Sequence, residues 1–75
     1  MEKRVFDVLN QVNDEIIRYD GKNMMLDGVI DSFEIIEIVA TLEEEFDIEI
    51  DAKDVVEANF LNKEAIINLV MKYCK

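Results

Sequence analysis

Asp31 and Ser32 are the adjacent residues best suited to chemistry in this 75-residue sequence. Ser32 is the only serine, and a helical pattern of apolar residues begins directly after it. The carboxylate of Asp31 can accept free backbone N–H groups of the first helical turn, which predicts that Asp31 is the N-cap. Glu34 can reach back to the cap's own N–H, as in a capping box. Ser32 then takes the first helical position, where its hydroxyl can point outward and serve as an attachment point.

Catalysis by the chain itself is not expected, because the usual catalytic side chains are missing. The sequence contains no histidine, which excludes a Ser-His-Asp triad and the common imidazole base. Cys74 is the only cysteine, so neither an intramolecular disulfide nor a cysteine metal cluster can form. The many carboxylates should lie on a solvated surface, where no pocket shifts their pKa values. We therefore expect neither an enzyme nor a resident metal ion.

The charge of the chain is strongly negative, with 18 acidic residues against 8 basic ones and a net charge of −10. Such a surface repels nucleic acids and anionic membranes, and it favours association with basic protein surfaces. The sequence shows neither a signal peptide nor an apolar run long enough to span a bilayer. These features predict a cytoplasmic monomer that does not insert into membranes.

Hydrophobic spacing predicts a single all-α domain over residues 1–75, with three longer helices, one short helix and a long first loop. The longer helices are expected over residues 2–18, 32–46 and 63–73, the last one capped by Asn62. The short helix is expected over residues 52–57, and an extended segment over residues 47–50. Both glycines, Gly21 and Gly28, fall in the loop between the first two long helices.

The same spacing predicts which side chains are buried. In the short helix, Val55 and Val56 should insert into the core. The loop at 19–30 should be anchored by Met24, Met25, Leu26, Val29 and Ile30. The predicted helical stripes are Val5, Val8, Leu9, Val12 and Ile16, then Ile35, Ile38, Val39, Leu42 and Phe46, then Ile66, Leu69, Val70 and Tyr73.

Two segments together suggest a family. Residues 26–33, LDGVIDSF, lead into an acidic amphipathic helix that ends in residues 42–50, LEEEFDIEI. This combination resembles the acyl carrier protein family of phosphopantetheine-dependent carriers, and the resemblance covers the chain in length, acidity, helix layout and serine placement. It implies an acyl-carrier-protein-like four-helix bundle.

The resemblance also implies a function. Ser32 would accept 4′-phosphopantetheine from coenzyme A as a phosphodiester, through a separate phosphopantetheinyl transferase (holo-carrier-protein synthase) whose magnesium Asp31 helps to hold. The thiol of the arm would carry acyl groups as thioesters between enzymes of fatty acid biosynthesis or a related pathway. The partners implied are acyl- or aminoacyl-loading enzymes and condensing enzymes with basic docking patches. The docking residues implied are Glu34, Glu37, Glu43, Glu44, Ile36 and Ala40. An attached chain would be sheltered between the second and last helices, beside Ile36, Ile38, Ile67 and Met71.

Alternatives remain open. Phe33 stands where fatty-acid carriers usually have leucine, and Ala40 where they often have a larger apolar residue. The chain can therefore also be an aminoacyl or D-alanyl carrier, or a carrier for polyketide or peptide synthesis. In a different class, it can be an unmodified helical protein-interaction module, because serine is common at helix starts and acidic helix faces are common on surfaces. The module would be distinguished from a carrier by a Ser32 that stays unmodified while a protein partner binds Glu34 and Glu37.

Overall fold

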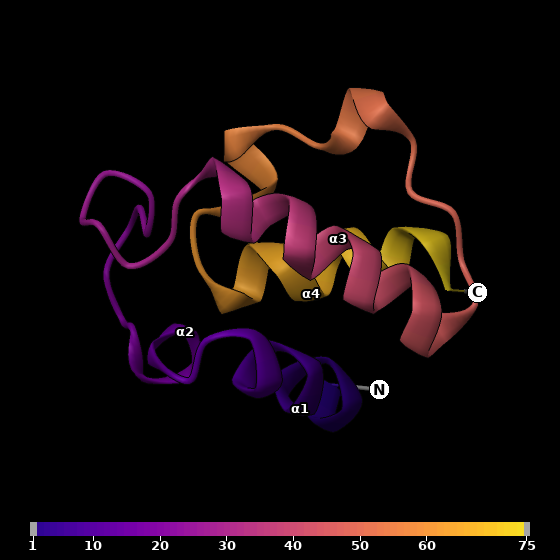
Figure 1. Cartoon of the computed structure of the whole chain (residues 1–75), viewed down its shortest axis with the longest axis horizontal. Coiled ribbons are helices and arrows are strands. Elements are labelled where there is room, and N and C mark those ends of the chain that lie inside the picture. Colours follow the sequence, from indigo (N-terminus) through magenta and orange to yellow (C-terminus); the bar gives the residue numbers. More distant parts are fainter. Residues whose placement is uncertain (1, 75) are drawn as a thin grey trace.

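The computed structural model describes residues 2–74, and all the regular secondary structure in this range is helical. The described residues form four α-helices. Figure 1 shows how these helices are arranged and the path of the chain between them. Two short 3₁₀-helices, η1 and η2, interrupt the connection between the last two α-helices. The prediction of an all-α fold is confirmed. The elements are α1 (Glu2–Val12), α2 (Glu15–Arg18), α3 (Ser32–Phe46), η1 (Ala52–Asp54), η2 (Glu57–Phe60) and α4 (Lys63–Tyr73).

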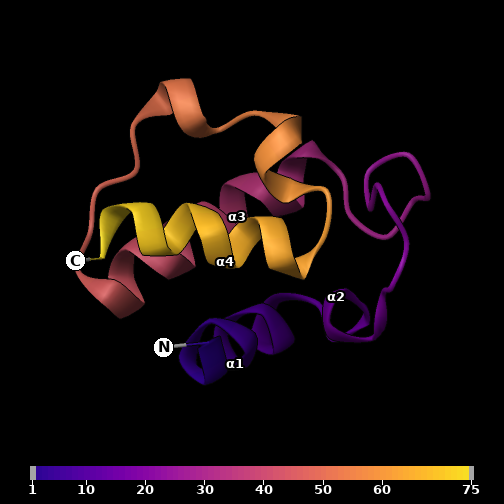
Figure 2. The same cartoon turned by 180° about the vertical axis from the view of Figure 1, so that it is seen from behind.

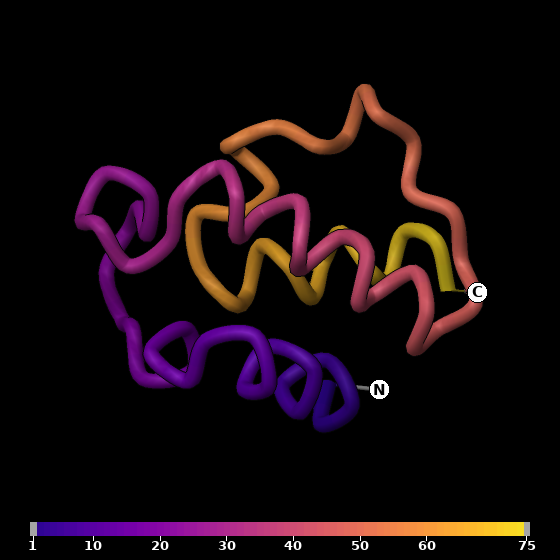
Figure 3. The backbone as a smooth tube through the Cα atoms, viewed as in Figure 1, coloured from indigo at the N-terminus to yellow at the C-terminus, as the bar shows by residue number. Residues whose placement is uncertain are grey.

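The helix α1 packs against both α3 and α4. The connection 47–62 runs along the side of the α3–α4 pair that faces away from α1, as the two opposite views show (Figures 1 and 2). The loop 19–31 closes the end of the molecule at which α3 begins (Figure 3). None of the described helices is both long enough and apolar enough to cross a membrane.

The apolar faces of these elements meet in one core, and most of the predicted stripes are confirmed. Four residues of those stripes, Val12, Val39, Phe46 and Tyr73, are only half-buried and pack at its edge. Ile67, which lies outside the predicted stripes, is also buried. The buried hydrophobic residues are Val5, Val8, Leu9, Ile16, Met24, Ile30, Ile35, Ile38, Leu42, Ile50, Phe60, Ile66, Ile67, Leu69 and Val70.

The predicted helix 2–18 is wrong in one respect, because it is broken after Val12. The side-chain oxygen of Asn13 accepts a hydrogen bond from the backbone N–H of Glu15 at 3.0 Å, which starts a new turn. Asparagine side chains compete in this way with the helical carbonyl partners of nearby N–H groups. The helix resumes as the four-residue α2, which ends at Arg18 as expected.

The prediction of an α-helix over residues 52–57 is also wrong. Only Ala52–Asp54 and Glu57–Phe60 are helical there, and both are 3₁₀-helices. Val55 is half-buried and Val56 is exposed, whereas Asp54 is buried with 8% of its surface accessible. The carboxylate of Asp54 binds Lys72 and Tyr73 of α4. Asp54 therefore faces the body of the protein, and Val56 faces solvent.

The loop 19–31 is held in place by buried apolar side chains and by hydrogen bonds of Tyr19. Met24 and Ile30 are buried, but Leu26, predicted as an anchor, is 83% exposed. The hydroxyl of Tyr19 donates to Asp27 at 2.5 Å and accepts from the backbone N–H of Asn23 at 2.8 Å. These two bonds close the turn that presents Leu26 to solvent.

Candidate functional site

The start of α3 has the predicted capping geometry. Asp31 is extended, with φ −126° and ψ −179°, and its Oδ1 accepts the backbone N–H of Glu34 at 2.9 Å. Its backbone carbonyl accepts the N–H of Ile35 at 3.1 Å. Asp31 is therefore the N-cap, and Ser32 is the first helical residue, as predicted.

Ser32 is exposed, and its hydroxyl takes part in none of the hydrogen bonds found among residues 2–74. The same holds for Oδ2 of Asp31, because the cap uses only Oδ1. A free hydroxyl and a free carboxylate oxygen thus lie on adjacent exposed residues. These residues fit a covalently attached phosphate group, and they fit a cation held beside it by another protein.

The reciprocal half of the capping box does not form. The carboxylate of Glu34 turns instead to Asn13, whose Nδ2 donates to Glu34 Oε2 at 3.2 Å and lies 3.5 Å from Oε1. Asn13 Nδ2 also donates to the backbone carbonyl of Val29 at 3.0 Å. Glu34 is half-buried at this contact, so its carboxylate stabilises the folded structure through Asn13.

Glu43, a second predicted docking residue, is also engaged internally. Its Oε2 accepts the backbone N–H of Ile50 at 2.9 Å, and its side chain is half-buried. This bond fastens the segment after α3 to the last turn of that helix. Glu37 and Glu44 are exposed, so of the four predicted docking glutamates these two offer their carboxylates most freely to a partner.

One face of α3 is exposed and combines apolar and acidic side chains. Phe33 is 80% exposed and Ile36 is 65% exposed. Successive intervals of three or four residues place side chains on a common helix face. The exposed stripe, as we call this face below, consists of Phe33, Ile36, Glu37, Ala40 and Glu44. Ser32 lies at its edge, one turn before Ile36.

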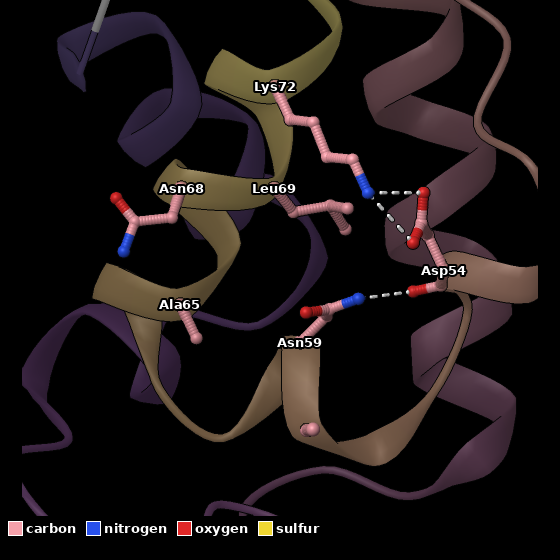
Figure 4. A pocket seen from close by; sticks show the side chains of 7 residues that line it. Asp54, Asn59, Ala65, Asn68, Leu69 and Lys72 are labelled. Carbon is pink, nitrogen blue, oxygen red and sulfur yellow. Dashed lines mark hydrogen bonds and ion pairs between the residues drawn. The ribbon is translucent and has the colours of Figure 1, made fainter.

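A second polar cluster joins the connection 47–62 to α4. Lys72 Nζ lies 3.1 Å from both carboxylate oxygens of Asp54, and the Tyr73 hydroxyl donates to Asp54 Oδ2 (Figure 4 shows the Lys72 pair). The backbone carbonyl of Asp54 accepts from Asn59 Nδ2 at 2.7 Å. The hydrogen bond from Tyr73, followed by that from Lys72, holds the pKa of Asp54 below its ordinary value. The Asp54 carboxylate in turn raises the pKa of Tyr73.

Sequence patterns did not predict this cluster, because Asp54 and Lys72 lie 18 residues apart and no local spacing shows that they meet. Two open hollows flank it, of about 360 Å³ and about 320 Å³. The first is lined by polar and small side chains, including Asn59, Ala65 and Asn68 (Figure 4). Neither hollow is lined by the residues expected to shelter an attached chain, because Ile38 and Ile67 are buried in the core while Ile36 and Met71 face outward.

Comparison of the chain with protein-family models, with curated proteins and with solved structures gave no match.

Proposed function

We propose that this chain is a carrier protein whose Ser32 receives 4′-phosphopantetheine from coenzyme A. The observation that carries the proposal is the free, exposed hydroxyl of the chain's only serine at the start of α3. Asp31 lies directly beside it with one carboxylate oxygen unused by the cap. When attached, the group supplies a thiol that carries acyl groups as thioesters.

The transfer is a substitution at phosphorus. Ser32 Oγ forms a bond to the phosphorus next to the pantetheine moiety of coenzyme A, and the phosphoanhydride bond breaks. Adenosine 3′,5′-bisphosphate leaves, and the hydroxyl proton passes to a base of the transferase. Oδ2 of Asp31 is available to the transferase's magnesium ion.

The position of Ser32 also favours the product electrostatically. The first backbone N–H groups and the dipole of a helix stabilise negative charge at its N-terminus. The attached phosphodiester is negative, and the chain carries a net charge of −10. Attachment at the start of α3 therefore lessens the repulsion that the phosphate would meet elsewhere on this surface.

The exposed stripe is the surface that we assign to partner enzymes. Its apolar side chains, Phe33 and Ile36, offer area to bury, and Glu37 and Glu44 offer charge to basic patches on loading and condensing enzymes. Exposed charge pairs mainly speed association and are screened by salt. Docking should therefore be fast, weak and sensitive to ionic strength.

The cargo is left open between fatty acyl groups, aminoacyl or D-alanyl groups, and intermediates of polyketide or peptide synthesis. Loading enzymes specific for each class would separate these carriers. The exposure of Phe33 and Ile36 also favours a second function, an unmodified protein-interaction module that uses the same stripe.

The test is intact-mass spectrometry after incubation with coenzyme A, magnesium and a phosphopantetheinyl transferase of broad specificity. We expect one added phosphopantetheine on the wild type and none on Ser32→Ala. Thr41→Val is the matched control, since Thr41 carries the other aliphatic hydroxyl, which donates to the backbone carbonyl of Glu37 at 2.8 Å. This variant should be modified like the wild type. A folded wild-type chain that several transferases leave unmodified would instead support the interaction module.

A further inference from the structure

Asn13 connects three segments through one half-buried side chain. Its Oδ1 accepts the N–H of Glu15 at the start of α2, and its Nδ2 donates to the carbonyl of Val29 and to the carboxylate of Glu34. A side-chain amide has two N–H donors and one carbonyl acceptor, and all three are used here.

The chemistry of these partners determines how the amide is oriented. Val29 and Glu34 both present acceptors, whereas Glu15 presents a donor. Exchanging the oxygen and nitrogen of Asn13 would place its oxygen against two acceptors and its amino group against a donor. The network therefore permits one orientation only.

The partners of Asn13 lie on both sides of Ser32. Val29 belongs to the end of the loop before it, and Glu34 to the first turn of α3 after it. The backbone N–H of Glu34 is also the group that binds Asp31 Oδ1 at 2.9 Å. A continuous path of contacts thus runs from Asn13 through Glu34 to the carboxylate beside Ser32.

We propose that Asn13 is a positioning residue for the transfer to Ser32, because its amide holds both sides of the Asp31–Ser32 pair against the break between α1 and α2. This inference rests on the proposed function. Asn13 does not touch the reacting atoms. It keeps the loop end and the first turn of α3 in the arrangement that presents the hydroxyl of Ser32 and the free oxygen of Asp31 together.

Asn13→Asp is the sharpest variant. It keeps an oxygen that can accept from the N–H of Glu15, but it replaces the amide donor with an acceptor that faces the carboxylate of Glu34. Adding Glu34→Gln supplies an amide donor at position 34 and can restore one bond across this contact. Asn62→Asp is the matched control, because the Oδ1 of Asn62 also accepts a backbone N–H near the start of a helix, that of Ala65 in α4 at 2.9 Å.

Two measurements are needed for each variant. The first is the steady-state kinetics of phosphopantetheine transfer, with kcat and KM determined separately. The second is amide hydrogen exchange of Glu34 and Ile35, the two N–H groups that Asp31 binds, measured without any transferase.

We expect Asn13→Asp to lower kcat by about tenfold and to speed exchange at Glu34 by a similar factor, as for the loss of one hydrogen bond to a charged group. KM should stay within about twofold, because the exposed stripe is unchanged. The double variant should recover part of both losses, because it restores the contact with position 34 but not the hydrogen bond to Val29. Asn62→Asp should show neither loss.

A wild-type kcat in Asn13→Asp, even with lowered thermal stability, would show that the amide is only structural and would overturn the proposal. Unchanged exchange at Glu34 would overturn it as well. Failure of the proposed function looks different, since the wild type itself would then not be modified. In that case the exchange data alone decide whether Asn13 holds the loop end and the first turn of α3 together. Faster exchange at Glu34 in Asn13→Asp, with slower exchange again in the double variant, would support this structural role.

Discussion

Two connections in this molecule use an aspartate in opposite ways. Before α3, Asp31 is exposed and binds the N–H groups of its own helix, which leaves the neighbouring hydroxyl of Ser32 free. Before α4, Asp54 is buried and binds Lys72 and Tyr73, which are distant in sequence. Short-range capping orders a backbone without covering it, whereas a long-range ion pair holds a connection against the body of the protein. The first arrangement suits a site that other proteins must reach, and the second suits a structural tie.

The largest expected effect comes from the core on which both connections rest. Leu42 is fully buried, so Leu42→Ala should lower the free energy of unfolding by about 2–5 kcal/mol through lost burial and the cavity left behind. Chemical denaturation measures this. Ile36→Ala, on the exposed stripe of the same helix, is the control and should change stability by about 0.5 kcal/mol or less. Equal losses in the two variants would contradict the assignment of buried and exposed faces of α3.

Asp54→Asn should have the next largest effect on stability. The substitution preserves shape but removes the charge that Lys72 and Tyr73 bind, so the thermal midpoint at neutral pH should fall. Modification of Ser32 should be unaffected, because none of the hydrogen bonds of Asp54 reaches the start of α3. Slower modification of this variant would show that the two connections are coupled.

The interactions of Asp54 with Lys72 and Tyr73 should also weaken in acid. Hydrogen bonds from Tyr73 and Lys72 lower the pKa of Asp54 below its ordinary 3.8, so folding favours the ionised carboxylate. Its stabilising contribution is therefore present above about pH 4 and is lost as the pH falls through the lowered pKa. Thermal midpoints measured from pH 7 to pH 2 should show the difference between wild type and Asp54→Asn shrinking at the acid end. A constant difference would contradict this reading.

Gly28→Ala tests the backbone of the loop before Ser32. Gly28 has φ +78°, a left-handed conformation, and a Cβ there would meet nothing within 4 Å. The loss should therefore be about 1 kcal/mol from backbone strain alone. Gly28→Asn should lose less, since asparagine tolerates this conformation better. Similar losses for alanine and asparagine would point to a cause other than φ.

The smallest expected change in stability belongs to Asp31→Asn. Asparagine caps helices about as well as aspartate, so the free energy of unfolding should change by only a few tenths of a kcal/mol. On the proposed function, the rate of Ser32 modification should nevertheless fall about tenfold or more, because Asp31 would no longer offer a carboxylate to the transferase's magnesium. Asp31→Ala should lose about 1 kcal/mol of stability in addition. An unchanged rate in Asp31→Asn would remove the metal-binding role from this residue.

Local patterns were enough to predict the helices that begin with a cap. Asp31 and Asn62 each accept an N–H from the first turn of the helix that they begin, and both helices end at the predicted residues. The exposure of Ser32 was predicted in the same way, because Asp31 is the cap and Ser32 is the first helical residue. The break after Val12 was not predicted, because Val5, Leu9 and Ile16 fit one continuous helical stripe. That break is supported by contacts of Asn13 with Val29 and Glu34, which lie far along the chain.

By itself, the sequence determined an acidic, all-helical chain without histidine, with its only serine at a capped helix start. These properties depend on composition and on interactions within one or two helical turns. The tertiary structure alone decided that Asp54 is buried against Lys72, that Val56 and Leu26 are exposed, and that Glu34 and Glu43 are engaged internally while Glu37 and Glu44 remain open to a partner. Each of these outcomes depends on partners brought close only when the chain is folded, and no local spacing specifies which distant groups will meet.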